Sequence, residues 1–249
     1  MKNRLLYAPE GVPALKYAVE ELEDRGVSIA SEPTDRVTHL LLPVPCKMDG
    51  QALASLLASL PRDVTVVGGM LNNAQLKGYR CIDLLEDPLY LAKNAMITAH
   101  CALRLAEGNL SVIWEGCPVL VLGWGRIGKC LSSILKKLGA EVSIAARKPE
   151  DLAMIAALGC DGRPIAGLDC ILRRYRVIFN TIPAPVLMSR QIQLCRKDCL
   201  LIELASSPGI EGASVIDGRG LPGKMAPESS GKLIARSVMR LCVREEETE

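Results

Sequence analysis

Three glycines with the spacing G-x-G-x-x-G interrupt the segment VLVLGWGRIGKCLSSILKKLG, residues 119–139, at Gly123, Gly125 and Gly128. Four apolar residues precede them, and apolar residues recur at helical spacing after them, which predicts a strand, a tight turn and a helix. In such a turn the first glycine permits the sharp bend, the second lets a pyrophosphate approach, and the third lets the helix pack on the strand. The alternative is a plain strand-to-helix turn, and the context favours a nucleotide site.

The free N–H groups at the start of the predicted helix suit a pyrophosphate. We therefore expect the whole turn to contact the nucleotide. The predicted contacts are Gly123, Trp124, Gly125, Arg126, Ile127 and Gly128.

The end of the next predicted strand indicates which nucleotide binds. NAD sites place an acidic residue there to bind the ribose 2′-hydroxyl. Here the segment EVSIAARKPE has Ala145 and Ala146, followed by Arg147 and Lys148. An arginine can form two parallel hydrogen bonds with a 2′-phosphate. The pattern favours NADP over NAD, with an FAD site less favoured and a solvent-facing basic loop as the alternative.

Two further segments contain candidate ligand contacts. VIFNTIPAPVL places Asn180 and Thr181 at the end of a predicted strand, beside the expected nicotinamide pocket, and Pro183 extends the following loop. GLPGKMAPESSGK places Lys224 on a loop constrained by prolines, just before a last helix expected to start at Ser229 or Ser230. Lys224 is a candidate carboxylate ligand, and the alternative is an ordinary surface lysine.

Short apolar strands alternate with helices along the chain, which indicates parallel sheets covered on both faces. The fold class that we predict is α/β, with two Rossmann-like parallel-sheet domains joined by a long helix. The predicted strands are residues 4–8, 27–30, 37–42, 64–67, 119–122, 142–145, 177–181, 200–204 and 215–216.

A long amphipathic pattern starts at Asp87-Pro88, a good helix start, and continues to Gly108. It predicts a helix that bridges two domains. We therefore divide the chain into a flavodoxin-like or Rossmann-like domain (1–86), the bridging helix (87–108), an NADP-binding Rossmann domain (109–228), and a C-terminal helix with an acidic tail (229–249).

Composition excludes several classes of protein. The 249 residues have a net charge of +2, which gives no bulk attraction to nucleic acid or to an anionic membrane. No apolar run reaches the roughly 18 residues of a transmembrane helix. The N-terminal residues lack the apolar core of a signal peptide, so we expect a cytoplasmic protein. The ten cysteines are scattered, and we interpret them as reduced thiols instead of disulfides or metal ligands.

Several of these motifs together resemble the family formed by the A subunits of dipicolinate synthase. The resemblance rests on GWGRIGK, AARKPEDLA, FNTIPAPVL, ELASSPG and LPGKMAPESSGKLIA, and in the first half on THLLLPVP and GYRCIDLLEDPLYLAKNAMITAHCAL. These segments occur in family order and span most of residues 37–241. The sequence departs from the family pattern at its first loop and at Ser207, where the family leads us to expect a lysine.

The resemblance implies an oxidoreductase subunit that works with a B subunit in spore-forming bacteria. Its substrate would be a cyclic dihydro- or hydroxytetrahydro-dicarboxylate, oxidised to dipicolinate with NADP. Two substrate carboxylates need cations or hydrogen-bond donors. We expect these from Lys224, Asn94 and Thr98, and His39 or His100 is a candidate proton acceptor.

Two other functions stay open at this point. One is an NADP-dependent reductase of another small carboxylate, similar to hydroxyacid dehydrogenases. The other is a non-catalytic cofactor-binding subunit that stabilises or regulates its partner. In each case we expect an oligomer and no metal.

Overall fold

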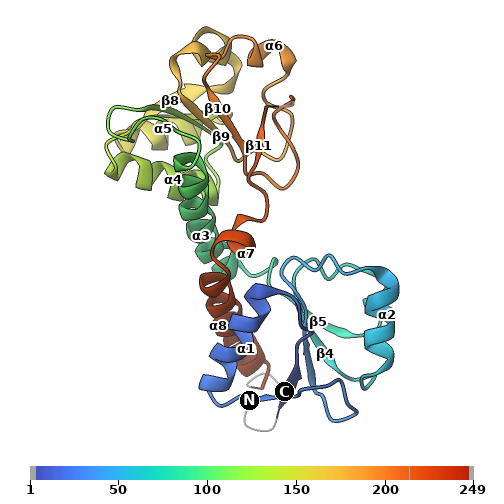
Figure 1. Ribbon diagram of the computed structural model, residues 1–249. Coiled ribbons are helices and arrows are strands. Elements are labelled where there is room, and N and C mark those ends of the chain that lie inside the picture. Colours follow the sequence, from blue (N-terminus) through green and yellow to red (C-terminus); the bar gives the residue numbers. More distant parts are fainter. Residues whose placement is uncertain (1–3, 213, 247–249) are drawn as a thin grey trace. The chain divides into compact units, whose positions relative to one another are not determined.

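Each of two units of the chain is built around its own parallel β-sheet (Figure 1). The computed structural model describes residues 4–212 and 214–246. One unit takes the residues up to Asn94 together with those from Pro222 onward, and the other takes Ala95–Leu221. Helix α3 (Pro88–Glu107) starts in the first unit and ends in the second. The predicted fold class, including the long connecting helix, is confirmed.

The first unit has a five-stranded parallel sheet in the order β2-β1-β3-β4-β5. This is the strand order of flavodoxin-like folds, in which ligands bind outside the carboxyl ends of the strands. Its elements are β1 (Leu5–Tyr7), α1 (Pro13–Asp24), β2 (Ser28–Ile29), β3 (His39–Leu41), α2 (Gly50–Ala58), β4 (Thr65–Gly68), η1 (Ala74–Leu76) and β5 (Arg80–Asp83).

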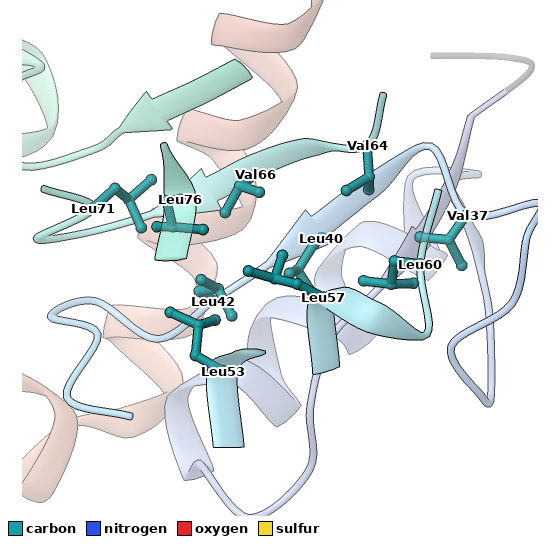
Figure 2. Packing of buried hydrophobic residues seen from close by; sticks show 10 residues of the cluster. All are labelled: Val37, Leu40, Leu42, Leu53, Leu57, Leu60, Val64, Val66, Leu71 and Leu76. Atoms are coloured by element: carbon teal, nitrogen blue, oxygen red, sulfur yellow. The ribbon is translucent and has the colours of Figure 1, made fainter. Parts of the chain in front are cut away.

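Leucines and valines fill the space between this sheet and α2. Figure 2 shows Leu53 and Leu57 of α2 beside Leu40 and Leu42, which come from β3 and the residue after it. All four side chains are buried. The apolar positions that predicted a strand and a helix therefore meet in one core.

The C-terminal helix α8 (Pro227–Glu246) packs along α1 in the same unit (Figure 1). Gly231 makes this contact close, because a Cβ atom built there would lie 2.5 Å from the carbonyl oxygen of Ala14. Arg236 forms an ion pair with Glu21 at 3.4 Å. The C-terminal helix, which the sequence set apart as its own segment, is thus an integral layer of the first unit.

The second unit has a six-stranded parallel sheet in the order β11-β10-β9-β6-β7-β8. Counted from β6, this is the 3-2-1-4-5-6 order of dinucleotide-binding Rossmann folds. Its elements are β6 (Pro118–Leu122), α4 (Arg126–Lys137), β7 (Glu141–Ala146), α5 (Pro149–Ala157), β8 (Asp161–Pro164), η2 (Ile165–Cys170), η3 (Leu172–Arg174), β9 (Val177–Asn180), α6 (Ser189–Ile192), β10 (Leu200–Glu203) and β11 (Ile216–Asp217).

Two strands, β5 and β8, were not predicted. Each lies at an edge of its sheet, and their sequences RCID and DGRP lack a continuous apolar run. An edge strand needs apolar residues less than a central strand does, because fewer of its side chains are buried. Hydrogen bonding to a neighbouring strand decides their conformation.

The prediction of a loop around Lys224 was wrong. Lys224 lies in a short helix, α7 (Leu221–Met225), and α8 begins at Pro227 instead of Ser229 or Ser230. Pro222 and Pro227 each stand in the first turn of a helix, where the missing N–H group has no partner to lose. The same prolines that suggested a rigid loop therefore start two successive helices.

Candidate functional site

The glycine turn follows β6 directly and leads into α4. Gly123 has a φ of +103°, a conformation that favours glycine, and its N–H donates to the carbonyl of Ala145 in β7 at 2.9 Å. Gly125 is the N-cap of α4 and has no side chain with which to cap it. The first N–H groups of α4 have no acceptor within the helix, so they are available to an anion.

The three glycines of the turn differ in the space around their Cβ positions. A Cβ on Gly123 would lie 2.4 Å from Oγ1 of Thr181, and one on Gly128 would lie 2.2 Å from the carbonyl oxygen of Gly123. A Cβ on Gly125 would meet no atom within 4 Å. Gly123 and Gly128 are therefore required by the fold itself, whereas the space beside Gly125 is open.

Thr181, a predicted cofactor contact, supports the glycine turn from the neighbouring strand. Its Oγ1 donates to the carbonyl of Leu122 at 2.8 Å, and its N–H donates to the same carbonyl at 2.9 Å. Strands β6 and β9 are paired with Leu122 opposite Asn180. This pairing is the point where the strand order reverses, which is where Rossmann folds bind their ligands.

Arg147 stands immediately after the last residue of β7, at the edge of the sheet that also carries the glycine turn. Its side chain is exposed, and it forms no hydrogen bond or ion pair with any described residue. Lys148 is exposed as well and lies 4.0 Å from Glu150. No acidic side chain stands at Ala145 or Ala146, and both are buried.

Trp124 and Arg126 flank Gly125 in the turn. The ammonium of Lys129 lies 5.6 Å from the centre of the Trp124 ring, a cation–π contact that holds the half-buried indole near α4. Arg126, the first residue of α4, is exposed and makes no ion pair among the described residues. Ile127 is half-buried on the same turn of helix. The six predicted contacts at residues 123–128 thus lie in the turn after β6 and the first turn of α4.

The predicted role of Asn180 as a cofactor contact is not supported for its side chain. That side chain is fully buried, and its Nδ2 donates to Oε1 and Oε2 of Glu203 at 2.9 and 3.0 Å. Its Oδ1 accepts from the N–H of Ile182 at 3.0 Å. Asn180 therefore organises the loop that carries Pro183, which is itself exposed.

Glu203 was not among the predicted site residues. It is buried at the end of β10, and it accepts hydrogen bonds from the N–H groups of Ala205, Gly209 and Ile210 as well as from Asn180. The sequence feature that indicates such a role is the acidic residue at the end of the otherwise apolar strand LLIE. A carboxylate in such a position is buried with its strand and needs donors.

The other predicted site residues have varied surroundings. Lys224 is exposed on α7, and Thr98 is buried in α3. Asn94 is half-buried in the first half of α3, while His100 is exposed further along the same helix. The burial of Thr98 does not favour direct contact with a ligand.

The buried position of His39 does not favour a role in proton transfer. It is buried at the first residue of β3, the end opposite the carboxyl edge of the sheet. Its Nε2 lies 3.1 Å from Nη1 of Arg4, and its Nδ1 lies 2.9 Å from Oγ1 of Thr38. Arg4 also donates to the carbonyl of Cys242 in α8 at 3.0 Å. His39 thus connects β3 with Arg4, the residue before β1, and through Arg4 with the C-terminal helix.

Within residues 4–212 and 214–246, the side chains of His, Cys, Asp and Glu form no cluster that could hold a metal ion. In the same part of the chain, no helix combines the length and the hydropathy needed to cross a membrane.

The chain is similar in sequence to two curated proteins. It is 27% identical over 170 residues to the A subunit of dipicolinate synthase from Bacillus subtilis, a match that covers 65% of this chain and 57% of that protein. It is 25% identical over 141 residues to glutamyl-tRNA reductase of Helicobacter hepaticus, covering 53% of this chain and 32% of that protein. Each match thus spans less than two thirds of the relative's length. No protein-family model matches the chain.

Solved structures agree with the sequence match. The crystal structure of the dipicolinate synthase A subunit from Bacillus halodurans aligns with a TM-score of 0.81 at 22% identity, covering 96% of this chain and 98% of that one. The counterpart from Bacillus subtilis gives 0.83 at 20% identity over 100% and 99% of the two chains. An L-alanine dehydrogenase gives 0.70 at 14% identity over 90% and 76%. The predicted resemblance to the A subunit of dipicolinate synthase is confirmed, and the fold is that of dehydrogenases.

Proposed function

We propose that the chain is an NADP-dependent oxidoreductase subunit that binds its cofactor at the glycine turn of the second unit. The observation that carries this proposal is the open space at Gly125, together with the guanidinium of Arg147, which is unpaired among the described residues. The first would admit a pyrophosphate, and the second would bind a 2′-phosphate. An acidic side chain at position 145 or 146 would bind a free ribose 2′-hydroxyl and repel a 2′-phosphate. Both positions are alanines, so this repulsion is missing.

The residues around the turn would share the binding of NADP. The N–H groups at the start of α4 and the side chain of Arg126 would face the pyrophosphate, and Arg147 and Lys148 the 2′-phosphate. The loop that begins at Thr181 would lie beside the nicotinamide, since it follows the strand next to β6. When bound, NADP would supply the hydride acceptor.

The reaction that we propose is the oxidation of a dihydro-dicarboxylate to dipicolinate, the product that the name of the Bacillus subtilis relative states. The substrate gives up a hydride, which yields NADPH, and a proton, so that the ring becomes aromatic. A hydroxytetrahydro substrate would also lose one molecule of water. Because aromatisation is itself favourable, the protein has mainly to orient the ring and its carboxylates. Lys224, exposed on α7, is our candidate for one carboxylate.

A partner protein is part of the proposal, because the name of the Bacillus subtilis relative describes one subunit of an enzyme. The test is to titrate the purified chain with NADP and with NAD by calorimetry. Turnover of the dicarboxylate is then followed through NADPH formation, with and without a B subunit. Tighter binding of NADP and turnover by the pair would support the proposal. Absence of binding of either nucleotide would overturn it, and NADP binding without turnover in any combination would indicate a non-catalytic role.

A further inference from the structure

The carboxylate of Glu203 joins segments that belong to different strands of the second unit. Its Oε1 accepts from Nδ2 of Asn180 and from the N–H of Ala205, both at 2.9 Å. Its Oε2 accepts from the N–H of Gly209 at 2.7 Å, from the N–H of Ile210 at 3.1 Å, and from the same amide of Asn180 at 3.0 Å. A buried charge is costly unless hydrogen bonds compensate for it, and here both oxygens are compensated.

These bonds fix both sides of an exposed loop tip. Ala205 and Gly209 bind to Glu203 through their N–H groups, while the three residues between them, 206–208, are exposed. The tip is therefore held at its two ends by one carboxylate. No residue other than glycine fits at position 209, because a Cβ atom there would lie 2.5 Å from Nδ2 of Asn180 and 2.5 Å from the carbonyl oxygen of Ala184.

The same network fixes a second exposed tip, residues 183–185, in the loop after β9. Asn180 accepts from the N–H of Ile182 and donates to its carbonyl, both at 3.0 Å. On the far side of this tip, the N–H groups of Val186 and Leu187 donate to the carbonyl of Gly209 at 2.8 and 3.1 Å. The two tips thus follow neighbouring strands, β9 and β10, and share a single buried anchor.

We propose that Glu203 is a positioning residue that holds these two tips in the geometry that receives the nicotinamide half of the cofactor. The inference rests on the proposed NADP site. With the 2′-phosphate bound at the end of β7, the other half of the dinucleotide extends across β6 toward β9 and β10. Glu203 itself contacts no ligand, because its carboxylate is buried and faces the loop backbone.

The chemistry of the anchor calls for an ionised carboxylate. Three backbone N–H groups and one amide donate to it, and a carboxylate has only acceptors to offer. A glutamine at this position would turn an NH₂ group toward at least one of those donors and leave the donor unsatisfied. Glu203→Gln is therefore nearly isosteric, yet it breaks the anchor on one side.

The experiment compares two ligands that share the adenosine half. NADP and adenosine 2′,5′-bisphosphate, which lacks the nicotinamide half, are titrated into the wild-type chain and into Glu203→Gln. We expect the substitution to weaken NADP binding about tenfold, as for the loss of hydrogen bonds to a charged group, and to leave the bisphosphate affinity within about twofold. Hydrogen exchange at residues 205–210 should accelerate at the same time.

Two further variants keep the test decisive. Asn180→Ala removes the amide that donates to Glu203 and leaves the three backbone N–H donors in place. It therefore keeps the inference testable if Glu203→Gln fails to fold. We expect it to weaken NADP selectively as well. Ser143→Ala is the matched control, because it deletes a 2.6 Å hydrogen bond from a buried serine to Asp161 in the same sheet without touching either tip. It should change neither affinity.

The outcomes separate this inference from the proposed function. A wild-type chain that binds neither ligand would contradict the NADP site itself. A wild-type chain that binds both, with Glu203→Gln and Asn180→Ala binding NADP unchanged, would overturn the role of Glu203 alone. Equal losses of NADP and of the bisphosphate would also overturn it, since they would indicate a general disturbance of the unit.

Discussion

A Cβ atom built on Gly128 would lie only 2.2 Å from the carbonyl oxygen of Gly123, so no residue other than glycine fits at position 128. The start of α4 therefore rests directly on the turn that follows β6. Gly125, two residues after Gly123, has a φ of −79° and empty space at its Cβ position. The first and third glycines of the motif thus serve the fold, and the second leaves room for a ligand.

This difference predicts two distinct phenotypes. Gly125→Val should abolish NADP and NAD binding while the circular dichroism stays near native, at a stability cost of about 1 kcal/mol for a poor N-cap. Gly128→Val should destabilise the fold by about 3 kcal/mol or more, because backbone would have to move. Urea denaturation and calorimetric titration of both variants make the test. Retained NADP affinity in Gly125→Val would mean that the glycines only form a turn.

Replacing Arg147 should change the choice of cofactor. Arg147→Asp removes a bidentate donor and adds a negative charge, so we expect NADP to bind at least about tenfold more weakly while NAD affinity is spared. Arg173→Asp is the control, since it makes the same charge change on an exposed residue. Arg173 precedes β9 and so lies near the amino ends of the strands, whereas Arg147 follows the carboxyl end of β7. Calorimetry in which both nucleotides weaken equally would remove Arg147 from the 2′-phosphate site.

Lys224 is predicted to bind a substrate carboxylate. Lys224→Ala should lower kcat/KM of the complex with its partner protein by roughly 10²-fold, about 2–3 kcal/mol for a lost charge-assisted hydrogen bond. NADP affinity should hardly change. Lys232→Ala is the control, because Lys232 already pairs with Glu228 at 2.5 Å on α8. Kinetics that match those of the control would leave Lys224 as a surface lysine.

The contact of α8 with α1 depends on Gly231. Gly231→Ala would place a Cβ atom 2.5 Å from the carbonyl oxygen of Ala14 and 2.6 Å from the Cβ of Tyr17, which forces the helices apart. We expect a loss of about 1–3 kcal/mol in the free energy of unfolding. Gly223→Ala, where a Cβ would meet no atom within 4 Å, should leave stability unchanged or raise it by up to about 1 kcal/mol. Equal denaturation midpoints for the two variants would contradict close packing at Gly231.

The sequence by itself determined the features that depend on neighbouring residues. The apolar run before Gly123, the glycine spacing and the helical period after it predicted the strand, the turn and the helix that the structure shows. The bridging helix was expected at residues 87–108 and is found at Pro88–Glu107. Such features are readable because strand period, helix caps and glycine conformations are set within a few residues of chain.

Only the tertiary structure decided the features that join distant segments. His39 was a candidate proton acceptor until Arg4, 35 residues away, was found beside its ring, and Asn180 was a candidate contact until its amide was found on Glu203, 23 residues away. Residue type states what a side chain can donate or accept, and the strand order determines which partners it meets. Because parallel strands bring remote loops to one edge of a sheet, the anchor at Glu203 exists only in the folded chain.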